Sequence, residues 1–418
     1  MRAMRRNRAI TIVATAALLS FLSAGKADAS GFVIYDLSAD ALAQSSAVSA
    51  SIENPMATWY NPAGLAFMPG WQVSLGGSYI RASNAFDPAS GGATVTANPG
   101  NFTLPTLAVG GRILDWFAVG LGIYTPYGLG TSWPKDWIGR EYAIDTSIQT
   151  LIINPTLAFQ LYKTVSLGVG ADIAYSAVDM VTGLPAAMGG TGHIGGTTWS
   201  AGGNIGLLWK AIPGMFHVAA TYRSRIALNF DGKADFDPDH PEFDRTLPDQ
   251  NGKASITVPD IITLGLTYRP MASLTLGLDV NVLLWSVYDK LVLDLEESAD
   301  IVHERKWKNG VTLRLGTDWI APIKPETGKL HVRGGFSFDL DPARKEYLDP
   351  SLPESNRLGL SIGLGYEYRW IQADLGYMFI YFLPAEATTG QESPEGTYHS
   401  YAHMLGLTLT GRFGPAAK

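Results

Sequence analysis

The sequence predicts an all-β protein, a 14-stranded antiparallel transmembrane β-barrel that holds an N-terminal segment in its lumen. Three observations lead to this prediction. The N-terminus carries an export signal. The rest of the chain repeats long segments in which apolar residues alternate with small or polar ones, and the connections between these segments are alternately long and very short. Together these features are typical of a bacterial outer-membrane barrel.

The export signal occupies residues 1–29. Four arginines precede an apolar run that ends in an Ala-x-Ala cleavage site at Ala27–Ala29, which is the pattern of a secretory signal peptide. Its removal takes away five basic residues and one acidic residue and changes the net charge from −7 to −11. An acidic exported chain is a poor candidate for binding nucleic acid. The chain has no cysteine, so disulfide bonds do not stabilise it.

The N-terminal segment, residues 30–69, follows the signal and carries many aromatic residues. That composition argues against a disordered periplasmic leader, which is the alternative interpretation. Two Asn-Pro steps, Asn54-Pro55 and Asn61-Pro62, mark turns, because asparagine can bond its own backbone. A barrel of 14 strands is too wide to be filled by its own side chains. We therefore predict that this segment folds compactly and plugs the lumen.

The barrel is predicted over residues 70–413, where period-two alternation marks the strands. Residues 165–175 and 358–369 are examples, with apolar residues at every second position. Such segments are long enough to cross a bilayer at a tilt, whereas strands of a soluble β-sandwich, the alternative fold, usually have about 5–6 residues. The fourteen predicted strands are 70–82, 103–114, 116–125, 147–161, 164–178, 197–210, 215–227, 254–269, 273–288, 307–320, 328–340, 356–369, 371–383 and 400–413.

The connections and the charged residues fit the same topology. The first four connections have about 20, one, about 21 and two residues, as expected when long external loops alternate with short periplasmic turns. A charge that faces lipid at mid-bilayer costs about 2–4 kcal/mol, so charged strand residues should face the lumen or the rims. They are Asp172, Arg223, Asp279, Arg314, Asp318, Glu367, Arg369 and Arg412. Residues 414–418 form a C-terminal tail.

The N-terminal segment resembles the hatch of FadL-type outer-membrane transporters, in particular through Asn61-Pro62-Ala63-Gly64-Leu65. Further stretches that resemble this family are 124–142, 258–270, 285–297, 352–368 and 396–413, so the resemblance covers essentially the whole mature chain. One departure is that Phe413 is followed by five residues, whereas the family normally ends the chain on an aromatic residue. The resemblance implies a barrel in the cell outer membrane of a Gram-negative bacterium, with a hatch in its lumen.

The resemblance also implies a function, which is passive uptake of long-chain fatty acids or other hydrophobic compounds. The ligand is caught in a groove between external loops, passes to a site beside the hatch and leaves sideways through a kink in the third strand. Import of monoaromatic hydrocarbons by the same route is the alternative, since a pocket of Leu, Phe and Met residues suits both. We expect a monomer whose partners are these small molecules, outer-membrane lipid and lipopolysaccharide.

Candidate residues can be named for each part of this route. We assign the inner ligand site to Phe32 and Ile34, and the fixing of the hatch to Asn61, Pro62 and Ala63. We assign the lateral opening to Ala118, Gly120 and Gly122, because glycine tolerates a bend; relief of crowding by the hatch is the alternative. We assign the external groove to apolar residues in predicted loops, namely Leu184, Met188, Phe230, Phe236 and Phe243. The alternative is that these residues pack the loops against each other.

Other functions have less support in the sequence. No His-Glu-x-x-His motif or phosphate-binding Gly-Lys loop is present, so we predict that the chain is not an enzyme, needs no cofactor and transports passively. Asp235, Asp237 and Asp239 have the spacing of a calcium loop, but His240 replaces the required glycine, so no metal site is predicted. A general porin for small polar solutes is the remaining alternative, and the predicted plug argues against it.

Overall fold

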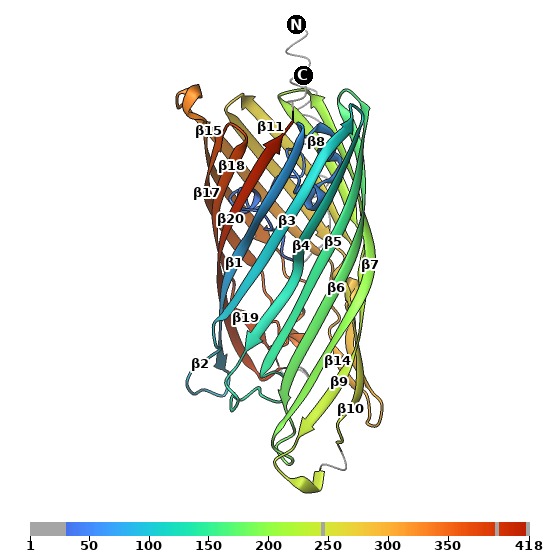
Figure 1. Ribbon diagram of the computed structural model, residues 1–418. Coiled ribbons are helices and arrows are strands. Elements are labelled where there is room, and N and C mark those ends of the chain that lie inside the picture. Colours follow the sequence, from blue (N-terminus) through green and yellow to red (C-terminus); the bar gives the residue numbers. More distant parts are fainter. Residues whose placement is uncertain (1–30, 244–246, 389–392, 415–418) are drawn as a thin grey trace.

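The computed structural model describes residues 31–243, 247–388 and 393–414. The predicted signal peptide and residues 415–418 of the predicted tail lie outside these ranges. The described chain forms one closed antiparallel barrel, a tall cylinder of tilted strands (Figure 1). The predicted all-β fold class is therefore confirmed.

Strand pairing runs once around the cylinder and returns to its start. β1 closes the circle with β20 in a ladder from Trp71↔Phe413 to Pro88↔Gly396. The wall has 14 strand positions, as predicted, because β8 with β9, β10 with β11, and β12 with β13 each share one position. The wall strands are β1 Trp71–Pro88, β3 Gly100–Leu114, β4 Phe117–Ser132, β5 Asp145–Tyr162, β6 Val165–Gly183, β7 Thr191–Ile212, β8 Phe216–Arg223, β9 Ile226–Asp237, β10 Gln250–Val258, β11 Ile261–Met271, β12 Leu274–Leu283, β13 Lys290–Leu295, β15 Gly310–Ala321, β16 Lys329–Asp339, β17 Arg357–Tyr368, β18 Ile371–Phe382 and β20 Gly396–Phe413. Short strands β2 Val95–Thr96, β14 Ile301–Glu304 and β19 Ala385–Ala387 pair at the external ends.

Two predicted strands, 215–227 and 254–269, are each broken once in the structure. The breaks include Arg225 in the first strand and Pro259 and Asp260 in the second. Proline has no N–H to donate to a sheet, which explains the second break. The Asp260 carboxylate accepts from the backbone N–H of Arg225 at 3.0 Å and pairs with its guanidinium at 2.7 Å. The two breaks therefore lie side by side and bond each other.

The external ends of several strands run further than predicted. β6 and β7 leave only residues 184–190 of the predicted loop 179–196, and β9 and β10 extend into the predicted loop 228–253. In Figure 1 these strands reach well below the rest of the barrel. Glycines such as Gly195 and Gly196 disfavour a strand by their own propensity, but pairing with β9 overrides that preference.

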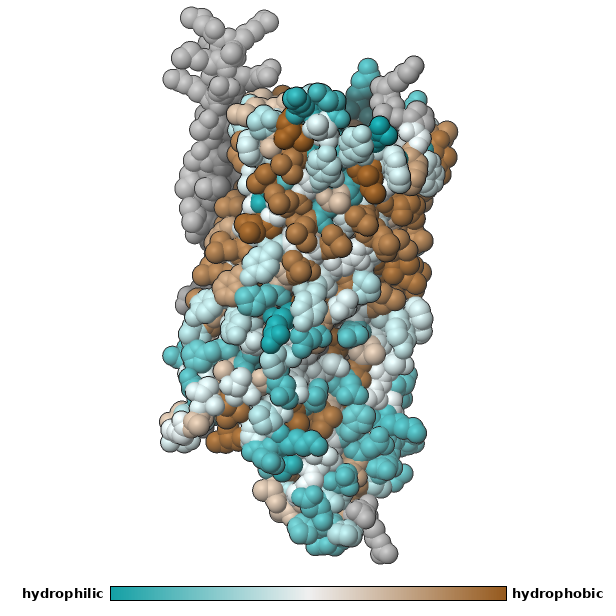
Figure 2. Space-filling view, turned by 60° about the vertical axis from the view of Figure 1, so that its left-hand side comes forward, coloured by the Kyte–Doolittle hydropathy of each residue, from teal (hydrophilic) through white to brown (hydrophobic). Residues whose placement is uncertain are grey.

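Alternation places apolar side chains on the outer face of the barrel. On β17, Leu360 and Ile362 are 59% and 65% exposed, whereas Ser361 between them is 3% exposed. On the face shown in Figure 2, apolar residues gather over the upper half of the barrel and hydrophilic residues over the external hairpins below. Such an apolar region is the lipid-facing surface of an outer-membrane barrel. Of the charged residues expected inside, Asp172 and Arg223 are both buried in the lumen.

The N-terminal segment lies inside the barrel and is almost wholly buried (Figure 1). Its helices are short, and they are α2 Ala39–Leu42, α3 Ala57–Tyr60 and the 3-10 helix η1 Pro62–Phe67. No helix in the described ranges is long and apolar enough to cross a membrane. Glycines on the inner wall make room for the segment, since a Cβ on Gly168 would lie 2.3 Å from the carbonyl carbon of Pro62.

Buried polar side chains of the wall bond the N-terminal segment. The Asp279 carboxylate accepts from the backbone N–H of Ser49 at 3.0 Å and from its hydroxyl at 2.8 Å. The Arg314 guanidinium donates to the carbonyl oxygen of Ser45 at 3.1 Å. Charge-assisted bonds of this kind are stronger than neutral ones, so they fix the segment to the wall.

Candidate ligand-binding site

The start of the N-terminal segment binds β4 where that strand is distorted. The backbone N–H of Ile34 donates to the carbonyl oxygen of Pro126 at 2.7 Å. Between Tyr124 and Tyr127, β4 has one residue more than its partner β5, which makes a β-bulge. Pro126 within the bulge has no N–H for the sheet. As a result Tyr124 and Tyr127, three positions apart, are both fully buried inside the barrel.

The barrel wall opens between β3 and β4 at the same level. The two strands stop pairing at Leu107↔Ile123, although both continue toward the external side. The Phe102 side chain of β3 reaches across this opening to β4. A Cβ on Gly130 of β4 would lie 2.5 Å from the Phe102 ring. The Phe102 side chain therefore fills a place where backbone hydrogen bonds are missing.

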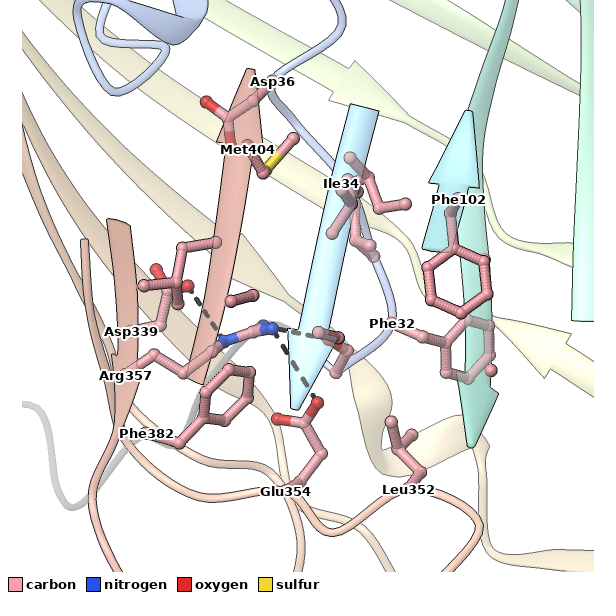
Figure 3. A pocket seen from close by; sticks show the side chains of 18 of the residues that line it. Phe32, Ile34, Asp36, Phe102, Asp339, Leu352, Glu354, Arg357, Phe382 and Met404 are labelled. Carbon is pink, nitrogen blue, oxygen red and sulfur yellow. Dashed lines mark hydrogen bonds and ion pairs between the residues drawn. The ribbon is translucent and has the colours of Figure 1, made fainter. Parts of the chain in front are cut away.

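A cavity lies next to the opening, between the start of the N-terminal segment and the wall (Figure 3). It holds about 1200 Å³ of space between protein atoms, part of which is open to solvent. Its wall is mainly apolar and comes from β1, β3, β4, β5, β16, β18, β20 and the loop before β17. The apolar side chains that line it include Phe32, Ile34, Ile80, Phe102, Leu104, Leu352, Met378, Ile380, Phe382 and Met404. A cavity of this kind suits a hydrophobic small molecule.

One end of the cavity is charged. The Arg357 guanidinium pairs with the carboxylate of Asp339 at 3.3 Å and lies 3.8 Å from an oxygen of the Glu354 carboxyl group. It also donates to the carbonyl oxygen of Gly31 at 2.9 Å. Figure 3 shows Asp339 and Glu354 on either side of Arg357, with apolar side chains beyond them. The cavity therefore suits a molecule with an apolar body and a polar head.

Glu354 is the most unusual group of this charged end. It is 2% exposed, and burial raises the pKa of its carboxyl group to about 8, although the charge of Arg357 acts in the opposite direction. Its oxygen Oε2 has no hydrogen-bond partner among the described residues. At neutral pH the carboxyl group is therefore mainly protonated and can donate a hydrogen bond to a polar head.

The two residues predicted for the inner ligand site, Phe32 and Ile34, both line this cavity. Phe32 also packs on Trp285, with ring centroids 4.8 Å apart, and lines a smaller neighbouring cavity. Their contact with a ligand stays a prediction.

The residues predicted to hold the N-terminal segment form a capped turn against the wall. The Asn61 side-chain oxygen accepts from the backbone N–H of Ala63 at 3.1 Å, and Pro62 starts η1. The Asn61 amide nitrogen donates to the carbonyl oxygen of Leu207 on β7 at 3.3 Å. The carbonyl oxygen of Ala63 accepts from the Ser166 hydroxyl on β6 at 2.9 Å. The turn thus bonds two wall strands.

The residues predicted for the lateral opening, Ala118, Gly120 and Gly122, lie on β4 but before the break. Their backbones are regularly paired with β3. A Cβ on Gly120 would lie 2.7 Å from the Leu65 side chain, and one on Gly122 would lie 2.4 Å from the Thr58 hydroxyl. These glycines therefore make room for the N-terminal segment, and pairing stops only after Ile123.

The five residues predicted for an external groove are spread over the long hairpins. Within the described chain, none of Leu184, Met188, Phe230, Phe236 and Phe243 lines the cavity of Figure 3. Phe230 is buried in the core of the barrel, and Leu184 is also buried. Leu184 and Phe236 both lie close to Gly192 of β7. This contact agrees with the alternative interpretation, in which the apolar loop residues pack the hairpins together.

Sequence reasoning missed Phe102, Glu354 and Arg357. A partial signal was present, because residues 377–382 are apolar on both faces and Met378 and Ile380 in this run line the cavity. The sequence also contains a Gly-x-Ser-x-Gly spacing at residues 359–363, as in some hydrolases. Its serine lies within β17 and bonds the Ser45 hydroxyl at 2.8 Å, which is not a nucleophile elbow.

The fold and the cavity define the class of protein, an outer-membrane β-barrel with an internal, mainly apolar cavity. The chain belongs to the family described as outer membrane protein transport protein (OMPP1/FadL/TodX), whose family model matches residues 20–413. This family consists of transporters of hydrophobic compounds rather than enzymes. The predicted family, the outer-membrane localisation and the non-enzymatic function are therefore confirmed.

Known relatives are distant in sequence and close in fold. The long-chain fatty acid transport protein of Escherichia coli O6:H1 is 22% identical over 333 residues, which cover 71% of this chain and 73% of the relative. The crystal structure of a Pseudomonas aeruginosa FadL homologue matches with a TM-score of 0.83 at 20% identity, over 92% of this chain and 100% of the other. The Pseudomonas putida toluene transporter TodX matches with a TM-score of 0.69 at 17% identity, over 93% and 100%.

Proposed function

We propose that this protein imports long-chain fatty acids passively across the outer membrane. The observation that carries the proposal is the cavity, which combines an apolar wall with a buried polar end formed by Arg357, Asp339 and Glu354. A fatty acid has the matching distribution, an apolar chain and one carboxyl head. Arginine binds carboxylates well, and a protonated Glu354 adds a hydrogen-bond donor.

In this proposal the ligand leaves the cavity sideways into the membrane. Two features support that route. Phe102 and Leu104 of β3 line the cavity, and they lie on the part of β3 that β4 no longer pairs with. The N-terminal segment acts as a hatch that blocks the direct path along the lumen, since its residues are buried against the wall. A single chain supplies the cavity and the opening, so we expect a monomer to suffice.

Monoaromatic hydrocarbons are the second candidate substrate. The aromatic side chains Phe32, Phe102 and Phe382 line the cavity and can stack on a small aromatic ring. Such a ligand would make no use of the charged end.

Uptake by cells that lack their own transporter of this kind tests the proposal. Labelled oleate and labelled toluene are compared for wild type and an empty vector, at matched amounts of folded barrel in the outer membrane. Uptake of oleate above the vector supports a fatty acid transporter, and uptake of toluene alone supports the second candidate. If neither enters while small sugars do and the purified protein conducts ions strongly, the protein is a general porin.

A further inference from the structure

A second hollow lies beyond Glu354, between the loop before β17 and the loop after β18. It holds about 550 Å³ of space between protein atoms, part of it open to solvent. We call this hollow the outer pocket. Its charged lining residues are Asp341, Arg344, Lys345, Glu354 and Glu386, and its exposed apolar lining residues are Leu383 and Pro384.

Glu354 forms a wall shared by the outer pocket and the inner cavity. It is the one charged residue that lines both spaces within the described chain. Its carboxyl group is buried, and its oxygen Oε2 finds no hydrogen-bond partner in the described ranges. Buried polar atoms are nearly always bonded in folded proteins, so such an atom between two spaces points to a ligand group.

The mouth of the outer pocket can receive an anion with an apolar chain. Lys345 pairs with Glu386 across the mouth at 2.6 Å, and both side chains are exposed. Exposed pairs contribute little stability, so Lys345 can exchange its partner for another carboxylate. The Arg344 side chain is exposed and forms no ion pair with the part of the chain that the structure describes. Leu383 and Pro384 add exposed apolar surface beside these cations.

We propose that the outer pocket is the entrance through which hydrophobic carboxylates reach the inner cavity. Arg344 and Lys345 attract the carboxylate, Leu383 and Pro384 contact the apolar chain, and the Glu354 side chain moves aside to let the ligand pass. The inference rests on the proposed function, because it assumes a fatty acid as substrate. It places the entrance away from the hairpins to which sequence reasoning assigned the external groove.

A single cysteine tests the entrance directly, because the chain contains no other cysteine. In Leu383→Cys the thiol lies in the outer pocket, and a bulky maleimide attached to this thiol should block the pocket. We expect labelling to abolish most oleate uptake and oleate to slow the labelling. The matched control is Ser90→Cys, an exposed residue in the loop after β1, where labelling should leave oleate uptake unchanged. Met188→Cys, in the groove assigned from the sequence, tests the other possible entrance. Full uptake after labelling of Leu383→Cys, or a block at Met188→Cys instead, would overturn the inference.

The charges of the mouth are tested with a neutral ligand as control. In the double variant Arg344→Gln/Lys345→Gln we expect uptake of oleate at limiting concentration to fall about tenfold at low salt, within the range of electrostatic steering. Uptake of methyl oleate should not change, and high salt should remove the difference. Lys233→Gln/Lys253→Gln, on the β9–β10 hairpin, is the matched control. An equal loss of methyl oleate uptake refutes the role of charge.

The outcomes separate this inference from the proposed function. If wild type takes up no oleate, both are wrong. If wild type takes up oleate and neither labelling nor charge removal at the outer pocket affects it, only the entrance is wrong.

Discussion

Replacing Arg223 by methionine should loosen the N-terminal segment from the barrel wall. The Arg223 guanidinium bonds the Asp172 carboxylate and donates to the carbonyl oxygens of Thr58 and Trp59, each at 3.2 Å. Asp172 is 0% exposed. Removal of one partner of a buried ion pair costs about 3–5 kcal/mol, because the other charge stays buried. Detachment of the segment exposes Asp172 to water and relieves this cost, so the detached state should become about a hundred to four thousand times more populated.

Single-channel conductance of the purified protein in a planar bilayer measures this effect. Wild type should conduct little, and Arg223→Met should show frequent openings. The double variant Arg223→Met/Asp172→Asn removes the unpaired charge, so it should recover a large part of the closed state. Arg369→Met is the matched control, because Arg369 is exposed at a turn. If Arg223→Met stays closed and unfolds at the same denaturant concentration as wild type, the pair does not hold the segment and the reasoning is refuted.

Three further predictions follow from the cavity and the packing. Phe102→Ala should widen the opening between β3 and β4, and it should raise oleate uptake where release limits the rate. Met404→Ala, on the far side of the cavity, should not raise oleate uptake. Equal effects of the two variants would contradict a role for Phe102 at the opening. The Glu354 carboxyl group has a pKa of about 8 in the folded state in place of 4.5, so the folded state binds this proton more tightly than the unfolded state does. The contribution of this group to the free energy of unfolding therefore falls as the pH rises from 4.5 to 8. Relative to wild type, the thermal midpoint of Glu354→Gln should therefore rise over this pH range, and a constant difference would argue against a buried protonated carboxyl. Gly168→Ala should cost about 1–3 kcal/mol by overpacking against Pro62, whereas Gly252→Ala, whose Cβ would have its nearest neighbour at 3.4 Å, should leave the denaturation midpoint nearly unchanged.

Much of the barrel could be predicted because its signals are local. A residue such as Leu360 faces lipid because its neighbours in the chain, Gly359 and Ser361, face inward, and this holds whatever strand lies alongside. The capped turn at Asn61 is also local, because the side chain bonds a backbone N–H two residues away. The strand breaks at Arg225 and Asp260 were harder to predict, since each is stabilised by a partner 35 residues distant.

The cavity could be predicted only in part. Phe32 and Ile34 were found because they are apolar residues in the segment expected to fill the lumen. Phe102 and Arg357 were not found, because each looks ordinary in its own strand. Phe102 fits the alternation of β3, and Arg357 reads as a charge at the start of β17.

By itself the sequence determined the barrel, its number of strands, the outward and inward faces and the presence of a compact segment before the first strand. The physical reason is that period-two alternation and strand length are properties of each strand separately. Only the tertiary structure decided where the wall opens, which residues surround the cavity and which carboxyl group is left buried at its charged end. These features are spaces and contacts between strands far apart in the chain, and they depend on the register of pairing and on where the start of the N-terminal segment binds β4.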